Sequence, residues 1–462
     1  MDVRGLVAVG AGKMAATLSR ALRLGGGTSY PGELARRLDP RLLATLAGGL
    51  SHGNVVVTGT NGKTTTSRLI ASILRQAGWR PVHNRSGANL LDGVAAALLA
   101  ATTLGGQLAG DAGLFEVDEA HLPAAVAETR PQVVVITNLF RDQLDRYGEI
   151  DHVARLWRTA LAALPPEATA VLNADDPLVA GLAEATRARV LHFGLEDARH
   201  AQSGAQHAAD SKRCLRCGAP FRYRAVYYGH VGHYACPGCG WERPQPSVLV
   251  RALEFRGVEG SDLALSLPSG PLALRLRLPG LYNVYNALAA VSVAHALGLP
   301  PAALKHGVER FSAAFGRLER VAIQGRSAFL ALVKNPVGFN EVLRTLCLEG
   351  SPRDLVIAIN DNLADGTDIS WLWDVDFEHL QGRVRTCLVT GTRAEDMRLR
   401  LKYAGVDLEH VTLEKDLRAA LHRGVQNAPP GGTVFVLPTY TAMLEARQIL
   451  ADEGYVGRFW ED

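Results

Sequence analysis

The chain has 462 residues and a formal net charge of +3, from 49 lysines and arginines against 46 aspartates and glutamates. Hydrophobic residues make up 47% and charged residues 21%, which excludes a wholly disordered chain and suits roughly two to four domains. The near balance of charge argues against a protein built around a nucleic-acid backbone. No apolar run is long enough to predict a membrane span, and the apolar start lacks a cleavage pattern, so we expect a cytoplasmic protein.

The first 50 residues are rich in Gly, Ala, Leu and Arg, and turns are predicted at GAGK (10–13) and GGGTSYPG (25–32). From residue 54 onward, short apolar strands alternate with helix-length segments. The predicted strands are NVVVTG (54–59), GLFEVD (113–118), QVVVITNL (132–139) and ATAVLNA (168–174). This alternation predicts an α/β fold with a parallel sheet.

A polar, cysteine-containing stretch interrupts this pattern, and PSVLVRALEF (246–255) and LALRLRLPG (272–280) then predict strands that return to the first sheet. YNALAAVSVAHALG (285–298) predicts a helix. From about residue 316, the strands FLALVK, DLVIAIND, RTCLVTG and TVFVLP predict a smaller, Rossmann-like α/β C-terminal domain. The predicted divisions are an N-terminal segment, a central domain, an insert within it and a C-terminal domain, at residues 1–50, 51–315, 205–247 and 316–462.

The segment TGTNGKTTT, Thr58 to Thr66, follows a β-branched strand and opens a helix, which is the context of a phosphate-binding loop. Glycines let backbone N–H groups converge on phosphate oxygens, and the helix N-terminus adds favourable partial charge. Lys63 can reach the β- and γ-phosphates, and the Thr64 hydroxyl can bind Mg²⁺. The alternative is a Gly/Thr turn before an ordinary helix. The predicted ATP-binding residues here are Thr60, Asn61, Gly62, Lys63, Thr64 and Thr65.

This loop resembles the ATP loop of the Mur ligases and folylpolyglutamate synthases, which convert a carboxylate to an acyl phosphate that an amine attacks. Other matching segments are FEVDEAHL (115–122), TNLFRDQLDRYG (137–148), LNADDP (172–177), LYNVYNALAA (281–290) and FGRLE (315–319). The resemblance covers about residues 50–460. It implies Glu116 as a Mg²⁺ ligand, adenine contacts from Asn283 and Asn286, and Arg317 near the γ-phosphate.

Two positions depart from this family's pattern. Gln143 replaces a histidine that binds a second metal, and Trp157 and Arg158 stand where many Mur ligases carry a carbamylated lysine. A second metal site would therefore lack its usual ligands. The usual N-terminal domain, which grips a UDP-sugar, is replaced by about 50 residues, which implies a substrate that is not a UDP-nucleotide.

Four cysteines form two C-x₂-C pairs, each followed by glycine: Cys214, Cys217, Cys236 and Cys239. Four thiolates predict a closed, tetrahedral structural Zn²⁺ site, with redox or iron–sulfur use as the alternative. His230 and His233 lie between the pairs and could replace a ligand. Nearby arginines would suit nucleic acid, but a solvated positive face is the favoured interpretation, and we expect no nucleic-acid partner. Cys347 and Cys387 are predicted to be core thiols.

The segment INDNLADGTD (359–368) follows an apolar strand, so its polar residues are expected at a strand's carboxyl end, where doubly wound sheets bind ligands. Its carboxylates could bind a cation or orient a histidine, or they could cap a solvated turn. The three candidate catalytic residues are Asp365, Asp361 and Asp368. Trp371 and Trp373 follow, and either mark a partner surface or enter the C-terminal core.

Together, the short N-terminal segment, NRSGANL (84–90), the four-cysteine insert, DNLADGTDISWLWD (361–374) and LPTYTAMLEAR (437–447) resemble the MurT family, the ligase-like subunits of lipid II isoglutaminyl synthases. The resemblance implies ATP- and Mg²⁺-dependent amidation of the D-Glu α-carboxylate of the lipid II stem peptide to D-isoglutamine. It also implies a heterodimer with a GatD-like glutaminase that supplies ammonia. An aspartate of this chain would complete the partner's Cys–His pair, with Asp365 ranked first.

Two other functions stay open. One is a stand-alone Mur- or folylpolyglutamate-synthase-type amino-acid ligase. The other is a zinc-ribbon ATPase that binds nucleic acid or scaffolds other proteins. For the amidating enzyme, contact with the inner face of the membrane through the lipid-linked substrate or the N-terminal apolar/Arg segment is a further expectation.

Overall fold

The structure is a computed structural model that describes residues 1–21, 29–84, 88–141, 150–202, 210–311, 317–347 and 351–457. Gln143 lies outside these residues. The backbone of Arg317 is described but its side chain is not. None of the helices in the described ranges is long and apolar enough to cross a membrane.

Three helices precede the first strand and pack with α5 (Leu91–Ala100): α1 (Val3–Ala21), α2 (Tyr30–Leu38) and α3 (Leu42–Ala47). The predicted turn at residues 10–13 is wrong, because these residues lie inside α1. There, a Cβ on Gly12 would lie 2.9 Å from a Leu99 methyl group, so the glycine permits close helix packing. Of the other predicted turn, residues 25–28 lie outside the described residues and residues 30–32 begin α2, where Gly32 lets the helix approach the backbone of Asp92.

The described central sheet has nine strands in the order β11-β10-β9-β6-β5-β4-β1-β3-β2. All pairings from β2 across to β9 are parallel, as predicted, whereas β9, β10 and β11 pair antiparallel. The strands are β1 (Asn54–Thr58), β2 (Pro81–His83), β3 (Ala112–Glu116), β4 (Val133–Ile136), β5 (Thr169–Asn173), β6 (Arg189–Leu195), β9 (Val248–Phe255), β10 (Ser261–Leu267) and β11 (Gly270–Leu276).

Helices cover both faces of this sheet, and the alternation of side chains along β1 shows it. Val55 and Val57 join the core beneath α4 (Lys63–Gln76), α10 (Leu281–Ala296) and α11 (Pro301–Glu309). Val56 points to the opposite core, with α3, α5, α6 (Leu122–Thr129) and α8 (Ile150–Ala162). Burial on both faces explains why the parallel strands are continuous apolar runs. The short helix α9 (Pro177–Ala180) follows β5.

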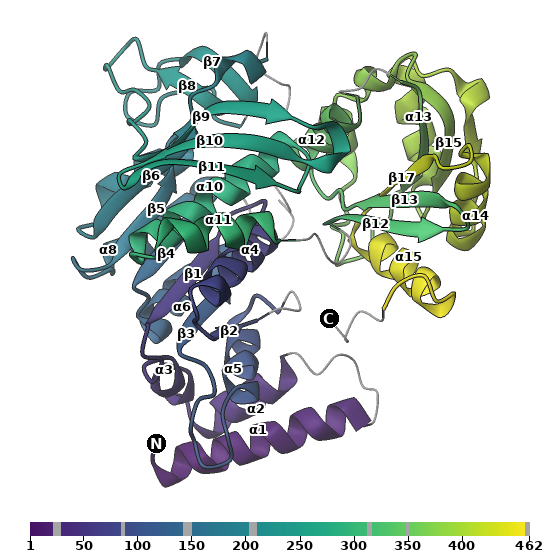
Figure 1. Cartoon of the computed structure of the whole chain (residues 1–462). Helices are drawn as coiled ribbons and strands as arrows, with labels where there is room; N and C mark the ends of the chain where they lie inside the picture. The colour runs from purple at the N-terminus through teal and green to yellow at the C-terminus, as the bar shows by residue number, and fades with distance from the viewer. Residues whose placement is uncertain are drawn as a thin grey trace.

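The four-cysteine insert forms a separate two-stranded antiparallel sheet, β7 (Arg222–Tyr228) with β8 (Val231–Ala235). It lies between β6 and β9 in the sequence and sits at the upper end of the central domain in Figure 1. The prediction of an inserted ribbon that interrupts the α/β pattern is confirmed.

A second, separate sheet forms the C-terminal domain (Figure 1). Its order is β12-β13-β17-β14-β15-β16, with an antiparallel β12–β13 pair and parallel pairing elsewhere. The smaller α/β domain is therefore confirmed. Its elements are β12 (Arg317–Ile323), β13 (Arg326–Ala331), α12 (Pro336–Cys347), β14 (Arg353–Ala358), β15 (Val384–Thr390), α13 (Ala394–Tyr403), β16 (Val411–Leu413), α14 (Leu417–Asn427), β17 (Thr433–Pro438) and α15 (Tyr440–Asp452).

Candidate functional site

The predicted phosphate loop connects β1 to α4, and its shape requires glycine at two positions. Gly59 and Gly62 have φ angles of 136° and 86°, a backbone region that other residues rarely adopt. A Cβ on Gly59 would collide with the Thr137 hydroxyl, and a Cβ on Gly62 would collide with the Asn286 side chain. Two of the segments that resemble the ligase family therefore lie against the loop, one through Thr137 and the other through Asn286.

Thr60 and Asn61 are fixed by the segment that follows β4. The Thr60 hydroxyl accepts a hydrogen bond from the Phe140 N–H at 2.9 Å and donates one to the Phe140 carbonyl at 3.1 Å. The Asn61 N–H donates to Asn138 Oδ1 at 2.8 Å. These bonds give the loop a defined path before any nucleotide arrives, whereas Thr65 is half-buried on the first turn of α4.

Lys63 is buried and ion-paired. Its Nζ donates to the Gly59 carbonyl at 2.6 Å and lies 2.7 Å from Glu119 Oε1. Glu119 belongs to the FEVDEAHL segment, directly after β3. A phosphate at this loop would have to compete with the Glu119 carboxylate for the ammonium group.

Thr64 and Glu116, the two predicted Mg²⁺ ligands, lie together. The Thr64 hydroxyl donates to Glu116 Oε1 at 2.9 Å, while Glu116 Oε2 is buried without a hydrogen-bond partner in the described structure. A hydroxyl beside an unsatisfied carboxylate oxygen fits a hard divalent cation, because Mg²⁺ prefers oxygen ligands.

Asn84 follows β2 directly and fixes the backbone of Glu116. Its Oδ1 accepts from the Glu116 N–H at 2.9 Å, and its Nδ2 donates to the Glu116 carbonyl at 2.8 Å. No role for Asn84 was predicted from the sequence. Its position at the start of the NRSGANL segment was the available signal.

Asn283 and Asn286 are buried on α10, beside the loop. Asn286 Oδ1 is 3.4 Å from the Thr66 hydroxyl, which donates to it, and Asn286 Nδ2 donates to Asn283 Oδ1 at 3.1 Å. Asn283 Nδ2 in turn donates to the Pro279 carbonyl at 2.8 Å. Asn286 therefore connects α10 to the first turn of α4, while Asn283 holds the Asn286 amide in place.

Trp157, at the position where many Mur ligases carry a lysine, is fully buried and donates its Nε1–H to the Glu119 carbonyl at 3.0 Å. The indole therefore supports the residue that pairs with Lys63. The remaining second-metal position, Gln143, and the Arg317 side chain lie outside the described part of the chain.

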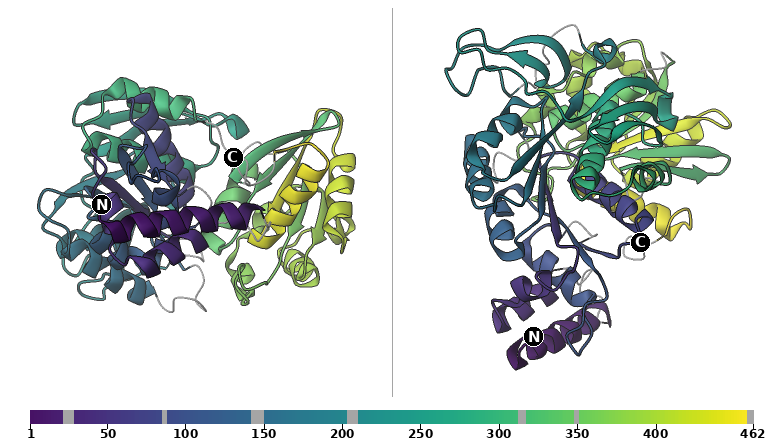
Figure 2. Two further views of the ribbon diagram at one scale, coloured as in Figure 1. Left: turned by 90° about the horizontal axis from the view of Figure 1, so that it is seen from below. Right: turned by 60° about the vertical axis from the view of Figure 1, so that its left-hand side comes forward.

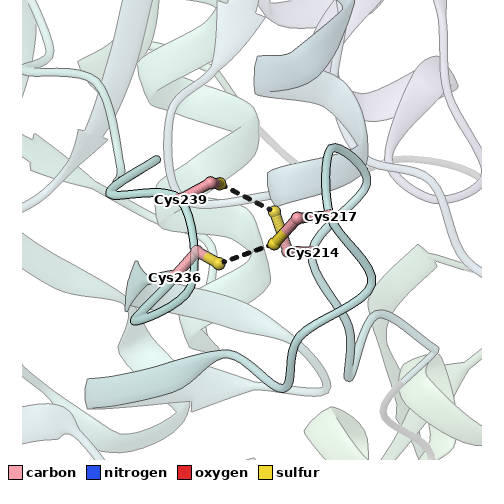
Figure 3. Close-up of side chains that lie close together, drawn as sticks. All are labelled: Cys214, Cys217, Cys236 and Cys239. Carbon is pink, nitrogen blue, oxygen red and sulfur yellow. Dashed lines mark hydrogen bonds between the residues drawn. The ribbon is translucent and has the colours of Figure 1, made fainter.

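The four insert cysteines converge on one point (Figure 3). All four sulfur atoms lie within 4.8 Å of one another, with 3.6 Å between Cys214 and Cys239 and 3.4 Å between Cys217 and Cys236. A tetrahedral zinc site with Zn–S bonds of about 2.3 Å requires sulfur separations of about 3.8 Å, so the donor set fits Zn²⁺. Both turns close identically, through Gly218 and Gly240 at φ 74° and 73°.

The two histidines between the cysteine pairs have other partners. His230 Nε2 lies 3.2 Å from Asp176 Oδ1, with both side chains fully buried, and His233 Nε2 lies 2.7 Å from the Leu195 carbonyl. Neither joins the cysteine cluster found in the described residues. His230 lies at the β7–β8 turn, so it joins the insert to the start of α9.

The basic face of the insert is partly neutralised within the chain. Arg216 pairs with Glu184 and lies over the Trp241 ring, 5.0 Å from its centroid. These contacts favour a structural role for Arg216 over nucleic-acid binding.

The three candidate aspartates of the C-terminal loop have different environments. Asp365 is 7% exposed and accepts hydrogen bonds from the Thr441 N–H at 2.8 Å and hydroxyl at 2.6 Å, at the start of α15. Asp361 accepts a hydrogen bond from the Thr392 hydroxyl and pairs with Arg393 at 2.7 Å. The hydrogen bond first, and the ion pair second, lower the pKa of Asp361. Asp368 is exposed and accepts only from its neighbour Ser370 among the described hydrogen bonds.

The two tryptophans that follow this loop lie in different environments, and a role at a partner surface stays a prediction. Trp371 is half-buried and packs against Phe339, with ring centroids 6.3 Å apart. Trp373 is 53% exposed, 5.6 Å from the Tyr403 ring, which is 67% exposed. Cys387 is buried as predicted, and burial raises its pKa to about 12, whereas Cys347 is half-buried.

Comparison with known protein families matches one region in the central domain and one in the C-terminal domain. A family model described as the Mur ligase middle domain matches residues 57–219, and one described as MurT ligase C-terminal matches residues 332–443. Among solved structures, a pseudomurein peptide ligase type C from Methanothermus fervidus superposes with a TM-score of 0.66 at 21% identity, covering 87% of this chain and 78% of the other. A MurF ligase from Thermotoga maritima in complex with ADP has a TM-score of 0.62 at 14% identity, covering 91% and 84%. These structures share the Mur-ligase fold.

Curated relatives extend over nearly the whole chain. The MurT subunit of lipid II isoglutaminyl synthase (glutamine-hydrolyzing) from Staphylococcus aureus strain COL is 34% identical over 444 residues, covering 96% of each chain. The subunit of the same name from Streptococcus pneumoniae strain R6 is 34% identical over 440 residues, covering 94% of each. With this identity and coverage, the chain belongs to the MurT family of Mur-ligase-like proteins.

Proposed function

We propose that this chain is the ligase subunit of a glutamine-dependent lipid II isoglutaminyl synthase. Its reaction would be the ATP-dependent amidation of the D-Glu α-carboxylate in the lipid II stem peptide, giving D-isoglutamine. The observation that carries the proposal is the convergence of Lys63, Thr64 and Glu116 at the loop between β1 and α4. The name and the 34% identity of the relatives support the choice of substrate.

The reaction has two balanced steps. A substrate carboxylate oxygen attacks the γ-phosphorus of ATP, and the bond to the β,γ-bridging oxygen breaks, which leaves ADP and an acyl phosphate. Ammonia then attacks the carbonyl carbon, the C–O bond to phosphate breaks, and the nitrogen loses a proton, which leaves an amide and inorganic phosphate. The barrier falls when positive charge faces the transferring phosphoryl group.

The residues of this chain have separable roles in that proposal. Lys63 would leave Glu119 to bind the phosphates, and the loop N–H groups and the start of α4 would hold the phosphate oxygens. Thr64 and Glu116 would hold Mg²⁺, which when bound neutralises phosphate charge. Arg317 would approach the γ-phosphate, and Asn283 and Asn286 would border the adenine. Cys214, Cys217, Cys236 and Cys239 would hold a structural Zn²⁺.

The ammonia would come from a GatD-like glutaminase bound as a heterodimer. An aspartate of the 361–368 loop would accept a hydrogen bond from the partner's histidine, fix its tautomer and stabilise the imidazolium formed when a cysteine attacks the amide. Each of the three aspartates already accepts hydrogen bonds at both oxygens, but Asp365 is 7% exposed whereas Asp368 is exposed, so a docked partner would reach Asp368 with less rearrangement. The four divisions at residues 1–50, 51–315, 205–247 and 316–462, and a cytoplasmic location at the inner membrane face, belong to the same proposal.

The test is ATP turnover with lipid II and glutamine, with and without the glutaminase partner. We expect ADP and amidated lipid II in equal amounts only when the partner is present, and ammonium chloride should replace partner and glutamine. K63A should abolish ADP formation while the zinc content stays unchanged. Full amidation by K63A, or amino-acid addition without any glutaminase, would overturn the proposal.

A further inference from the structure

The first helix, α1, presents an exposed apolar stripe. Val3, Val7, Met14 and Leu18 are 77%, 58%, 62% and 54% exposed. Their spacing of four, seven and four residues places all four on one side of a helix with 3.6 residues per turn. Between them lies Gly10, where an added Cβ would meet nothing within 4 Å. The described structure therefore leaves this side of α1 uncovered.

The opposite side of α1 explains how the helix is held. Ala8 and Val9 are fully buried, and Gly12 allows close approach to Ala35 on α2 and Leu99 on α5. Figure 1 places α1 at the lower end of the molecule, and Figure 2 shows the helix along its length when the molecule is seen from below. The apolar stripe therefore faces away from the rest of the protein on a firmly packed helix.

Positive charge accompanies the stripe. Residues 1–50 contain seven lysines and arginines against three acidic residues, a net charge of +4. Because the whole chain carries +3, residues 51–462 carry −1. On the helical period, Arg4 and Lys13 flank the stripe on its two sides. Arg37 and Arg41 pair with Glu33 and Asp2, so Arg4, which is exposed, and Lys13 are the cations that border the stripe in the described structure.

A further exposed apolar side chain, Leu104, lies in a loop that contacts α1. The loop Thr102–Leu108 contacts α1, since a Cβ on Gly106 would lie 3.2 Å from both Leu6 and Met1. That loop exposes Leu104 by 70%. Exposed apolar residues are ordinary singly, but a row of large ones on one helix marks an interaction surface.

We propose that this stripe docks the protein on an anionic lipid bilayer. The helix lies in the plane of the interface, Val3, Val7, Met14 and Leu18 enter the headgroup–acyl boundary, and Arg4 and Lys13 contact the acidic headgroups. This combination of an apolar stripe with flanking cations is what interfacial helices use. The surface is separate from the nucleotide loop, so lipid binding is expected whatever reaction the loop supports.

A second copy of the chain is the main competing occupant. Two stripes packed together would bring the Arg4 and Lys13 side chains of both copies close together, and their repulsion opposes that arrangement. A nucleic acid would contact the arginines but would leave the four apolar side chains in water. Charge and apolarity together therefore favour the bilayer.

The experiment is co-sedimentation of the full chain with vesicles of phosphatidylcholine containing 30% phosphatidylglycerol, at physiological salt. We expect the wild-type chain to bind pure phosphatidylcholine vesicles at least tenfold more weakly than the anionic vesicles. We expect the V7N/M14N variant to bind the anionic vesicles at least tenfold more weakly than the wild type does. L399N is the matched control, because Leu399 is 45% exposed on α13 of the other domain, and it should bind like the wild type. Hydrogen exchange should show protection at residues 3–18 on vesicle addition.

Three outcomes would overturn the proposal: no sedimentation of the wild type, unchanged sedimentation of V7N/M14N, or a dimer in solution that this variant converts to a monomer. The last outcome would assign the stripe to self-association. As a control for folding, V7N/M14N should have the melting temperature and the zinc content of the wild type. Because sedimentation needs no ATP, failure here leaves the proposed ligase reaction untouched, and the reverse also holds.

Discussion

Asn61 in the phosphate loop and Asn335 at the start of α12 exchange two amide hydrogen bonds. Asn335 Nδ2 donates to Asn61 Oδ1 at 2.9 Å, and Asn61 Nδ2 lies 3.4 Å from Asn335 Oδ1. Asn335 is fully buried, and its Oδ1 also accepts from the Gly338 N–H at 2.8 Å. A pair of residues 274 positions apart therefore connects the nucleotide loop to the C-terminal domain.

This contact predicts energetic coupling between the two residues. We expect N61A and N335A to be non-additive in a double-mutant cycle of unfolding free energy, with a coupling of about 1 kcal/mol, because each single change removes the same pair of hydrogen bonds. The cycle N61A with N427A is the control, since Asn427 is exposed at the end of α14. Additive effects for the first pair would show that the contact contributes nothing.

A second prediction concerns Glu341, which is buried where α12 meets the central domain. Within the described part of the chain neither carboxylate oxygen has a hydrogen-bond partner, and a guanidinium nitrogen of Arg344 lies 3.8 Å from Glu341 Oε1. Burial, partly offset by Arg344, raises the pKa of Glu341 from 4.5 to about 7. The protonated form is therefore favoured by folding, and its contribution to stability is complete below pH 4.5 and is lost as the pH rises through 7.

We expect E341Q to be more stable than the wild type at pH 8, by on the order of 3 kcal/mol at most, and nearly equal to it at pH 4.5. Urea unfolding at both pH values measures this difference. E409Q, at an exposed position, should show no such pH dependence. An E341Q variant that is destabilised equally at both pH values would contradict the assigned protonation.

The cysteine cluster predicts one zinc per chain. C214S should lose the metal and become sensitive to protease between residues 210 and 247, because metal binding provides much of the folding energy of such small ribbons. C347S should keep the metal, since Cys347 lies apart from the cluster on α12. Elemental analysis decides the matter, and iron with visible absorbance in place of zinc would contradict it.

The acidic loop predicts different roles for its aspartates. D365N should lower the unfolding free energy by about 1–3 kcal/mol, because an asparagine cannot accept both hydrogen bonds from Thr441. D368N, at an exposed position, should change it by less than about 0.5 kcal/mol. Chemical denaturation of each variant checks both values.

D361N, D365N and D368N together test the proposed link to a glutaminase partner. Loss of glutamine hydrolysis with retained ammonium-dependent amidation would identify the aspartate that completes the partner's triad. Full glutamine hydrolysis by D361N, D365N and D368N alike would rule this loop out.

Much of the architecture could be predicted because it rests on local signals. The strands around Val55–Val57 and Val133–Ile136 are buried on both faces, so they stand out as apolar runs. The loop at Gly59–Lys63 and the cysteine pairs are recognisable from spacing alone. Their chemistry depends on residue types that few other structures require.

What could not be predicted depends on distant contacts. Gly12 and Gly32 suggest turns in the sequence, yet they serve helix packing, because the neighbours that need the space are far along the chain. The Asn61–Asn335 pair and the His230–Asp176 contact join separate segments in the same way. The resemblance ranks Asp365 first among the three aspartates and that stays a prediction; its burial and its two hydrogen bonds from Thr441 at the start of α15 could not be predicted, because Thr441 is 76 residues away.

The most direct test of the central claim follows one oxygen atom. Lipid II labelled with ¹⁸O in the D-Glu α-carboxylate is incubated with the chain, ATP, Mg²⁺ and ammonium, and the released phosphate is examined by mass spectrometry. An acyl phosphate transfers one carboxylate oxygen to phosphate, so we predict one ¹⁸O in phosphate for each amide formed. Amide formation with unlabelled phosphate, or ATP hydrolysis without any amide, would contradict the account.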